Sequence, residues 1–396
     1  MTSPITTTRW PAILLLIGAG YCVSLQAGKL PATLPLLTHD IGLGIVAAGW
    51  LVSAVAALAA VGGVFAGSIA GRVGARRMAL VGMTLSAAGS AIGALWPTVA
   101  GLMLSRIVEG AGFIATVVAV PPLLLGFSRQ EDQQTVMAVW PTYFPVGMTV
   151  MLLLTPVLIA LAGWRCVWAV NAAIVAAWAA LVAAMIPHDV ETAPPAGNML
   201  SAVRLDVAAL IAARTPLWLG LAFAAYASQF LAVMAFLPVL LSETAAVTPS
   251  NAALLTAFVV GLNGIGNVLG GVLIRRGVPI FGLMASACIA MVVGALLVFQ
   301  PDLPFGIRFA GACLFCFVGG CLPSATFARV PTLPLEPRLR AVAVGVVTQA
   351  AAIGQFIGPP LLAGVVTAGG SWSYAPIYTV ACALICLLAA RRATRE

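Results

Sequence analysis

The feature that most constrains this chain is a series of long apolar runs, separated by short loops that hold most of its charges. A helix that crosses the hydrocarbon core of a bilayer needs about 20 mostly apolar residues, and the runs are close to that length. Cutting the sequence at charges, prolines, glycines and turns predicts twelve membrane-spanning helices. They cover residues 10–36, 46–70, 78–96, 98–125, 136–162, 166–187, 216–241, 251–273, 278–299, 304–328, 341–367 and 374–390.

The composition excludes other classes of protein. Apolar residues make up 62% of the 396 residues and charged residues only 8%, whereas soluble domains carry roughly 25% charged residues. So few charges cannot cover a soluble domain of this size, which excludes a soluble enzyme, a disordered protein and a secreted disulfide scaffold. The net charge of +8 indicates anionic lipid head groups rather than nucleic acid, since the sequence has no basic face interleaved with aromatic residues. We therefore expect membrane lipids, and no nucleic acid, as partners.

The basic residues orient the predicted spans. If the N-terminus is cytoplasmic, almost all arginines outside the spans fall in cytoplasmic loops, and Arg165 lies on the outer side. This asymmetry follows the positive-inside rule and supports an even number of spans. The first run is too long for a signal peptide and carries Lys29, so we interpret it as the first span. The expected location is the inner membrane of a bacterium, with both termini in the cytoplasm.

The spans divide into two similar halves. The polar segment 188–215 separates six spans from six, and we interpret it as a cytoplasmic linker that includes a short surface helix at 199–213. The bundles on either side of it are expected at 1–187 and 216–396. A basic loop follows the second span of each half, and a proline-containing pair lies in the fifth. Parallel repeats of this kind are typical of transporters whose substrate site lies near the bilayer midplane, at the interface of the repeats.

Charged residues within the spans are the first candidates for function. A charge at the bilayer centre costs at least ~2.5–3.5 kcal/mol and usually faces a cavity or a partner. On the first span, Cys22, Gln26, Lys29 and Thr33 share one helical face. One interpretation is that Lys29 binds an anionic group of the substrate and that Gln26 lies beside the same path. The other is that the Lys29 side chain extends outward to the membrane surface.

Arg106 and Glu109 lie three residues apart on the fourth span, so they can pair on one helical face. The pair could be structural, or Arg106 could face the substrate while Glu109 exchanges protons. Glu109 is the one carboxylate that we place well inside a span, so proton coupling through a membrane carboxylate predicts this residue. If Glu109 compensates Arg106, we expect Lys29 to have no carboxylate partner, and a bound anion would relieve the cost of its charge.

Three short motifs resemble sequences of the major facilitator superfamily. Residues 67–77, Gly-Ser-Ile-Ala-Gly-Arg-Val-Gly-Ala-Arg-Arg, are similar to the cytoplasmic loop signature of that family. Gly71 stands where the signature usually has an acidic residue, which weakens the case for the charge-relay latch that the motif implies. The segment 106–110 resembles the second signature, and Gly-Trp-Arg at 163–165 is another common feature. The gating residues that this resemblance implies are Arg72, Gly74, Arg76 and Arg77.

The resemblance covers the whole chain and implies an all-α integral membrane fold of two pseudo-symmetric six-helix bundles. More narrowly, the segment 29–35 resembles the cyanate and nitroimidazole permease group. In the superfamily, spans one, four, seven and ten line the centre and spans two, five, eight and eleven lie alongside, which implies that their polar side chains contact the substrate. The alternative for each is an interhelical hydrogen bond. Besides Lys29, Gln26 and Arg106, the candidates are Tyr143, Tyr226, Gln229, Asn263, Asn267 and Gln355.

Other chemistry is not expected. Cys313 and Cys316 have a metal-like spacing, but no second such pair follows, so we predict neither a metal nor another cofactor. The sequence has no P-loop and no hydrolase or protease motif. We therefore predict a monomeric secondary transporter, not an enzyme, that moves a small organic or inorganic anion such as a carboxylate by alternating access. The alternative is a proton-coupled exporter of apolar drug-like compounds.

Overall fold

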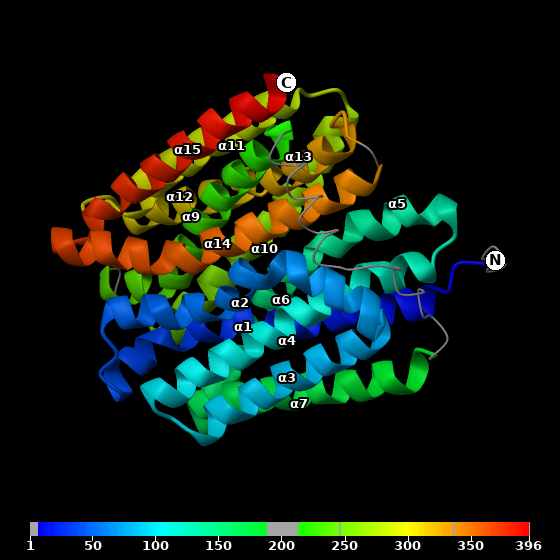
Figure 1. Cartoon of the computed structure of the whole chain (residues 1–396). Coiled ribbons are helices and arrows are strands. Elements are labelled where there is room, and N and C mark those ends of the chain that lie inside the picture. Colours follow the sequence, from blue (N-terminus) through cyan, green and yellow to red (C-terminus); the bar gives the residue numbers. More distant parts are fainter. Residues whose placement is uncertain (1–6, 188–212, 245–246, 336, 396) are drawn as a thin grey trace. The chain divides into compact units, whose positions relative to one another are not determined.

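The computed structural model describes residues 7–187, 213–244, 247–335 and 337–395 (Figure 1). Within these ranges, the side chains of residues 63–73 and of some residues in the segments 133–141 and 331–344 are not described. Most of the predicted linker, with the surface helix expected at 199–213, lies outside the described residues.

The described secondary structure is helical throughout. Twelve of the described helical segments are long and apolar enough to cross a membrane, which confirms the predicted fold class. The elements are α1 (Trp10–Asp40), α2 (Ile45–Val73), α3 (Ala75–Leu95), α4 (Val99–Gly126), α5 (Gln130–Val139), η1 (Trp140–Thr142), α6 (Tyr143–Ala162), α7 (Trp164–Met185), α9 (Thr215–Thr244), α10 (Pro249–Arg275), α11 (Ile280–Val298), α12 (Phe305–Gly319), α13 (Cys321–Arg329), η2 (Val330–Thr332), α14 (Pro337–Gly369), η3 (Trp372–Tyr374) and α15 (Ala375–Arg395).

Two of the predicted spans are interrupted helices. The span expected at 136–162 begins within α5, passes through the 3₁₀ turn η1, and continues as α6. Pro141 lies in that turn, where its missing N–H removes an α-helical hydrogen bond. The span expected at 304–328 is divided into α12 and α13 at Gly320, where a Cβ atom would lie 2.3 Å from the carbonyl oxygen of Asn263 on α10. Close packing against α10 therefore requires glycine at this break.

The short turn expected between the third and fourth spans is present. Only residues 96–98 separate α3 from α4. The hydroxyl of Thr98 accepts a hydrogen bond from the backbone N–H of Gly101 at 3.2 Å, and so caps the start of α4. A threonine at this position satisfies one of the amide groups that the first turn of a helix leaves without a partner.

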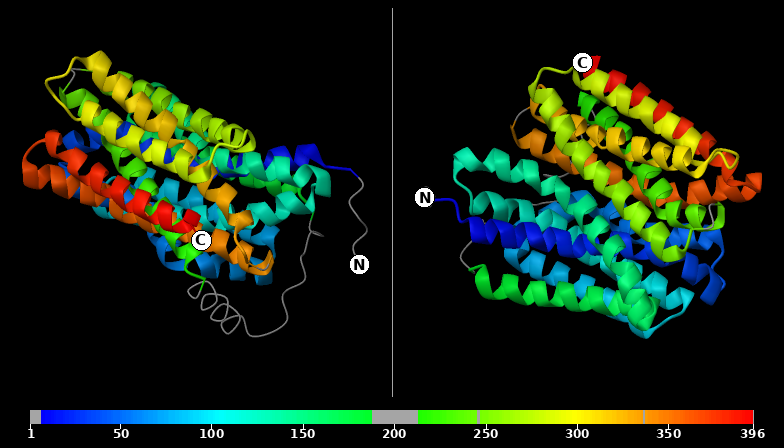
Figure 2. Two further views of the ribbon diagram at one scale, coloured as in Figure 1. Left: turned by 90° about the horizontal axis from the view of Figure 1, so that it is seen from above. Right: turned by 180° about the vertical axis from the view of Figure 1, so that it is seen from behind.

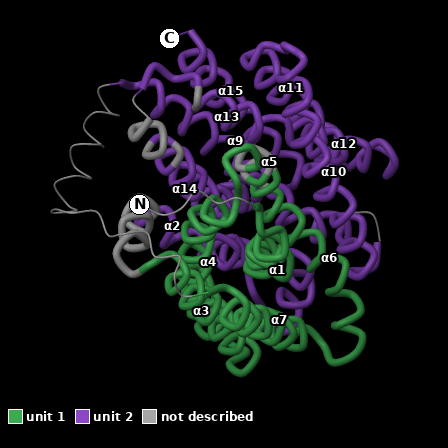
Figure 3. Tube along the Cα trace, turned by 90° about the vertical axis from the view of Figure 1, so that its right-hand side faces the viewer, with its two compact units in different colours: residues 1–30, 65–196 green, residues 31–64, 197–396 purple. Residues whose placement is uncertain are grey.

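The contacts divide the chain into two compact units (Figure 3). Unit 1 contains residues 1–30 and 65–196, and unit 2 contains residues 31–64 and 197–396. The end of α1 and most of α2 are thus grouped with the later helices. The division into bundles at 1–187 and 216–396 remains a prediction.

In unit 1, α3 packs closely against α4 and also contacts α7 (Figure 1). Glycines make the approach of α3 and α4 possible. A Cβ atom on Gly112 would lie 2.4 Å from the carbonyl oxygen of Gly82, and one on Gly89 would lie 2.7 Å from the backbone nitrogen of Glu109. Small residues at helix contacts are a common basis of packing in membranes, where apolar side chains gain little by leaving lipid. The contact at Gly89 also places the backbone of α3 directly beside Glu109.

In unit 2, α9 is almost entirely buried and contacts α10, α14 and α15. Its aromatic side chains pack along its own length, with the ring of Tyr226 stacked on Phe223 at 5.8 Å and on Phe230 at 5.7 Å between centroids. Figure 2 shows α15, in red, alongside α11, in yellow-green. These contacts make α9 the central helix of unit 2.

The packing at Gly89 predicts the effect of Gly89→Ala. The added methyl group has no space against the backbone of α4, and overpacking of this kind typically costs about 1–3 kcal/mol. Alanine favours a helix over glycine by only about 1 kcal/mol, so we expect a lower melting temperature in detergent. Gly271→Ala on α10 is the matched control, because a Cβ atom there meets nothing within 4 Å. An unchanged melting temperature for Gly89→Ala, equal to that of the control, would contradict the close packing.

Candidate functional site

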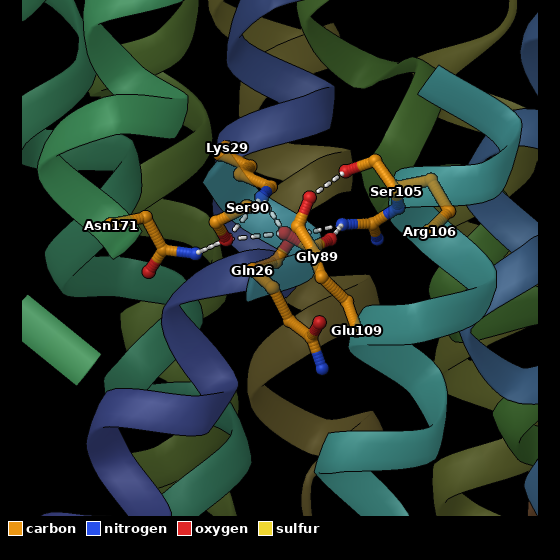
Figure 4. Close-up of polar contacts among 8 residues, drawn as sticks. All are labelled: Gln26, Lys29, Gly89, Ser90, Ser105, Arg106, Glu109 and Asn171. Carbon is orange, nitrogen blue, oxygen red and sulfur yellow. Dashed lines mark hydrogen bonds and ion pairs between the residues drawn. The ribbon is translucent and has the colours of Figure 1, made fainter. Parts of the chain in front are cut away.

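Three of the predicted charged residues lie together inside unit 1 (Figure 4). Lys29 comes from α1, and Arg106 and Glu109 come from α4. Their exposed fractions are 0%, 2% and 0%, so all three are shielded from solvent and lipid. The interpretation that Lys29 extends to the membrane surface is therefore wrong.

One carboxylate contacts both cations. Arg106 Nη1 donates to Glu109 Oε2 at 2.6 Å, which is the i, i+3 pair expected from the spacing on α4. Lys29 Nζ donates to the other carboxylate oxygen, Glu109 Oε1. The expectation that Lys29 lacks a carboxylate when Glu109 compensates Arg106 is thus wrong, because Glu109 uses one oxygen for each cation. We call Lys29, Arg106 and Glu109 the charged cluster.

Two polar side chains that the sequence analysis did not identify complete the surroundings of the carboxylate. Ser90 on α3 donates its hydroxyl hydrogen to Glu109 Oε1. The Ser90 oxygen accepts from Lys29 Nζ at 3.1 Å and from the Asn171 side-chain nitrogen at 2.8 Å. A hydroxyl group can donate one hydrogen bond and accept two, so Ser90 is fully used here. It links α1, α3, α4 and α7 in one network.

Sequence reasoning missed Ser90 because a serine among small residues of an apolar helix is usually a packing residue. Asn171 carried a stronger signal, since it is an amide side chain within the sixth apolar run. A further neighbour is Trp168 on α7, one helical turn before Asn171. Its ring centroid lies 4.8 Å from Lys29 Nζ, a distance at which the face of the ring attracts a cation.

Several polar atoms around the charged cluster are buried without a hydrogen-bond partner among the described residues. They include both side-chain amide atoms of Gln26, Arg106 Nε, Asn171 Oδ1 and Trp168 Nε1. The backbone carbonyl of Gln26 accepts from Arg106 Nη1 at 3.1 Å, while its side-chain amide points away from the Glu109 carboxylate (Figure 4). Buried polar groups normally form hydrogen bonds, so these donors and acceptors are the atoms around the cluster that could bind a ligand.

The charges of the cluster do not balance. Two cations and one carboxylate leave a formal charge of +1 in a buried site. Burying a charge is costly unless it is paired and hydrogen-bonded. The site can therefore offer a net positive charge together with hydrogen-bond donors, which is the chemistry that binds an anion.

Tyr143, the remaining candidate of unit 1, lies in an aromatic group at the break between α5 and α6. Its ring centroid is 4.7 Å from that of Trp140 and 6.1 Å from that of Phe113. The Tyr143 side chain is partly buried. This arrangement fits the packing of the broken helix, and no contact that we describe links it to the charged cluster.

The candidates of unit 2 are uncharged polar side chains, and two of them are joined by a hydrogen bond. Asn263 donates from its side-chain nitrogen to Tyr226 Oη at 3.0 Å. This is an interhelical hydrogen bond, the alternative to substrate contact that the sequence left open for these residues. Gln229 is fully buried, and neither atom of its amide has a hydrogen-bond partner among the described residues. Asn267 and Gln355 are partly buried. Both hydrogen-bonding atoms of the Gln229 amide could therefore form hydrogen bonds with a ligand.

One of the candidate gating residues, Arg76, is hydrogen-bonded to the end of α7. Gly74 has a φ of 92°, which favours glycine, and precedes α3. Arg76 is buried and donates to the carbonyl oxygens of Ala183 and Ile186, both at 2.7 Å. Arg77 is exposed, and the side chain of Arg72 is not among those described. Arg76 thus satisfies carbonyl groups that the last turn of a helix leaves without a partner.

Twelve apolar helices, with ionisable side chains buried among them, are features of the class of membrane transporters. Within that class, the chain belongs to the Major Facilitator Superfamily, whose family model matches residues 14–359. A search of curated proteins gave no match.

Solved transporter structures share the fold at low sequence identity. A bacterial homologue of the human lysosomal transporter Spinster, inward-facing and unoccupied, has a TM-score of 0.79 and 15% identity, over 98% of this chain and 97% of that one. The nucleoside transporter NupG, solved as a mutant, has a TM-score of 0.74 and 15% identity, over 96% of this chain and 99% of that one. The xylose transporter XylE from E. coli, in an inward open conformation, has a TM-score of 0.74 and 13% identity, over 95% of this chain and 95% of that one.

The shared carboxylate predicts that removing Glu109 is more harmful than removing Lys29. Glu109→Gln leaves two buried cations without a counter-charge, and breaking a buried pair in this way costs about 3–5 kcal/mol. Lys29→Gln leaves Arg106 and Glu109 as a neutral pair. We therefore expect a clearly lower melting temperature for Glu109→Gln than for Lys29→Gln in the same detergent.

The exposed Arg129–Glu131 pair, joined at 2.8 Å, provides the control. Glu131→Gln should change the melting temperature little, since surface ion pairs contribute about 0–1 kcal/mol. Equal losses for Glu109→Gln and Lys29→Gln would show that the two cations do not depend on one carboxylate.

Proposed function

We propose that this protein is a secondary transporter that moves a small organic or inorganic anion across the membrane by alternating access. The observation that carries the proposal is the charged cluster, which buries two cations with one carboxylate. A monovalent anion bound there would bring the formal charge of the site from +1 to zero while Glu109 is ionised, and from +2 to +1 when Glu109 is protonated. The proposed location is the inner membrane of a bacterium, with both termini in the cytoplasm, and the proposed functional form is a monomer.

The donors for the anion come from the residues that line the cluster. Lys29 and Arg106 provide the charges, and the Gln26 amide provides a donor that has no other hydrogen-bond partner among the described residues. In unit 2 we propose that Gln229, with its unsatisfied amide, is a neutral contact to the substrate. The remaining proposed contacts are Tyr143, Tyr226, Asn263, Asn267 and Gln355.

Glu109 gives this site a route to proton coupling. The carboxylate and an incoming anion would compete for the same two cations. A proton on Glu109 cancels its charge and frees Lys29 and Arg106 for the anion, so protonation and anion binding favour one another. This linkage supports symport of the anion with a proton. The loop residues Arg72, Gly74, Arg76 and Arg77 are proposed to act in the conformational change.

The anion proposal predicts the effect of Lys29→Gln on binding. The substitution removes the excess charge, and losing one partner of a buried charge interaction costs about 2 kcal/mol or more, which is about thirtyfold in affinity. Lys29→Arg should retain part of the binding. The measurement is a thermal-shift screen of purified protein with carboxylates, cyanate, nitrate and lipophilic cations, followed by titration of the ligands found.

Arg276→Gln is the matched control, because it removes one charge from an exposed position at the end of α10. It should bind the anion with unchanged affinity. An anion that binds Lys29→Gln as tightly as the unmodified protein would overturn the role of Lys29. Stabilisation by lipophilic compounds alone would favour the exporter of apolar compounds instead.

Coupling through Glu109 predicts that anion affinity rises as the pH falls. Uptake of one proton with each anion gives at most about a tenfold change in affinity per pH unit. In Glu109→Gln the affinity should no longer depend on pH, and substrate exchange should continue while accumulation driven by a proton gradient is lost. Anion affinity that does not vary with pH in the unmodified protein would remove Glu109 from the coupling mechanism, whether or not the variant folds.

A further inference from the structure

A pocket in unit 2 lies apart from all the residues discussed above. It has a volume of about 680 Å³ and is formed by the start of α11, the end of α13 and the end of α15. These are ends of three candidate spans, so the pocket lies where a membrane meets water. Its lining residues are Pro279, Ile280, Phe281, Arg329, Leu387, Leu388, Arg391, Thr394 and Arg395.

The polar part of this pocket is strongly basic. Arg329 is held in place by donating from Nε to the carbonyl oxygen of Ala393 at 3.2 Å and from Nη1 to Thr332 Oγ1 at 2.9 Å. Arg391 and Arg395 are exposed and lie one helical turn apart on α15. Within the described part of the chain, neither of these two arginines forms an ion pair. Three guanidinium groups around one cavity favour an anionic group with several oxygen atoms, such as a phosphate.

The start of α11 adds to this positive potential. Its N-terminus follows Pro279, and no side chain caps its first amide groups. The N-terminus of a helix carries a partial positive charge and free N–H groups, which favour a nearby anion. Ile280 and Phe281, the first residues of α11, line the same pocket.

The apolar part of the pocket continues along α15. Leu384 and Leu388 are 55% and 65% exposed, and they lie on the helical face that leads to Arg391 and Arg395. The neighbouring arginine, Arg392, belongs to a different face, where its guanidinium lies 6.0 Å from the ring centroid of Trp218. A ligand that fits this surface has an anionic head and an apolar tail that runs along the span.

We propose that this pocket binds an anionic phospholipid, with its phosphate between Arg329, Arg391 and Arg395 and its acyl chain along Leu384 and Leu388. The charge of the arginines selects an anionic head group over a zwitterionic one. The exposed leucines distinguish a lipid from a free phosphate ion, because inorganic phosphate gains nothing from an apolar surface. This site does not depend on the transported substrate.

Native mass spectrometry of the full-length, delipidated protein in detergent tests the proposal. Phosphatidylglycerol, phosphatidylcholine and inorganic phosphate are titrated separately, and the bound adducts are counted. We expect a tight phosphatidylglycerol adduct, which is weakened about thirtyfold in the double variant Arg391→Gln/Arg395→Gln, since each arginine near a membrane surface contributes about tenfold or less to binding. Phosphatidylcholine should bind weakly, and inorganic phosphate should not replace the lipid.

Arg275→Gln/Arg276→Gln is the matched control, because it removes the same charge from the end of α10, outside the lining of the pocket. It should keep the adduct. Leu388→Ser, which keeps all the arginines, should weaken phosphatidylglycerol binding and so tests the acyl surface even if the double arginine variant does not fold. Equal loss in the control, equal binding of phosphatidylcholine, or full replacement by inorganic phosphate would each overturn the proposal.

Discussion

The arrangement of unit 1 depends on one carboxylate that serves two cations. Glu109 accepts hydrogen bonds from Lys29 on α1, from Arg106 on its own helix and from Ser90 on α3. Ser90 in turn accepts a hydrogen bond from Asn171 on α7. In the interior of a membrane protein no water competes freely for these groups, so each is stable only while its partners stay in place. The network therefore makes the packing of four helices depend on a single carboxylate side chain.

The candidate residues of the two units differ in charge. In unit 2 the hydrogen-bonded pair of Tyr226 and Asn263 is uncharged, and so is Gln229, whose amide has no hydrogen-bond partner among the described residues. The charged cluster belongs entirely to unit 1. Among the candidate substrate contacts, all the charged side chains thus lie in unit 1, and those in unit 2 are uncharged.

The spans were predictable from the sequence because their signal, apolar length, is independent of tertiary contacts. The breaks within two of them were not, since a proline within an apolar run is compatible with both a bend and a 3₁₀ turn, and the close contact of Gly320 with α10 exists only in the folded structure. Lys29, Arg106 and Glu109 were found because charges are rare in such helices. Their mutual contact was only half predicted: spacing along one helix indicates the Arg106–Glu109 pair, but no local pattern shows that α1 brings Lys29 to the same carboxylate. Ser90 was missed for the same reason, because its role exists only when three other helices are in place.

The two hydrogen bonds of Arg76 have a mechanical consequence. They join the first turn of α3 to the carbonyl groups at the end of α7, across a sequence separation of 110 residues to Ile186. The chain between these points, from α3 to the end of α7, is thereby closed into a ring by one guanidinium group. Unwinding the last turn of α7 would move the Ala183 and Ile186 carbonyl groups away from Arg76, so this end of the helix can unwind only if both hydrogen bonds break.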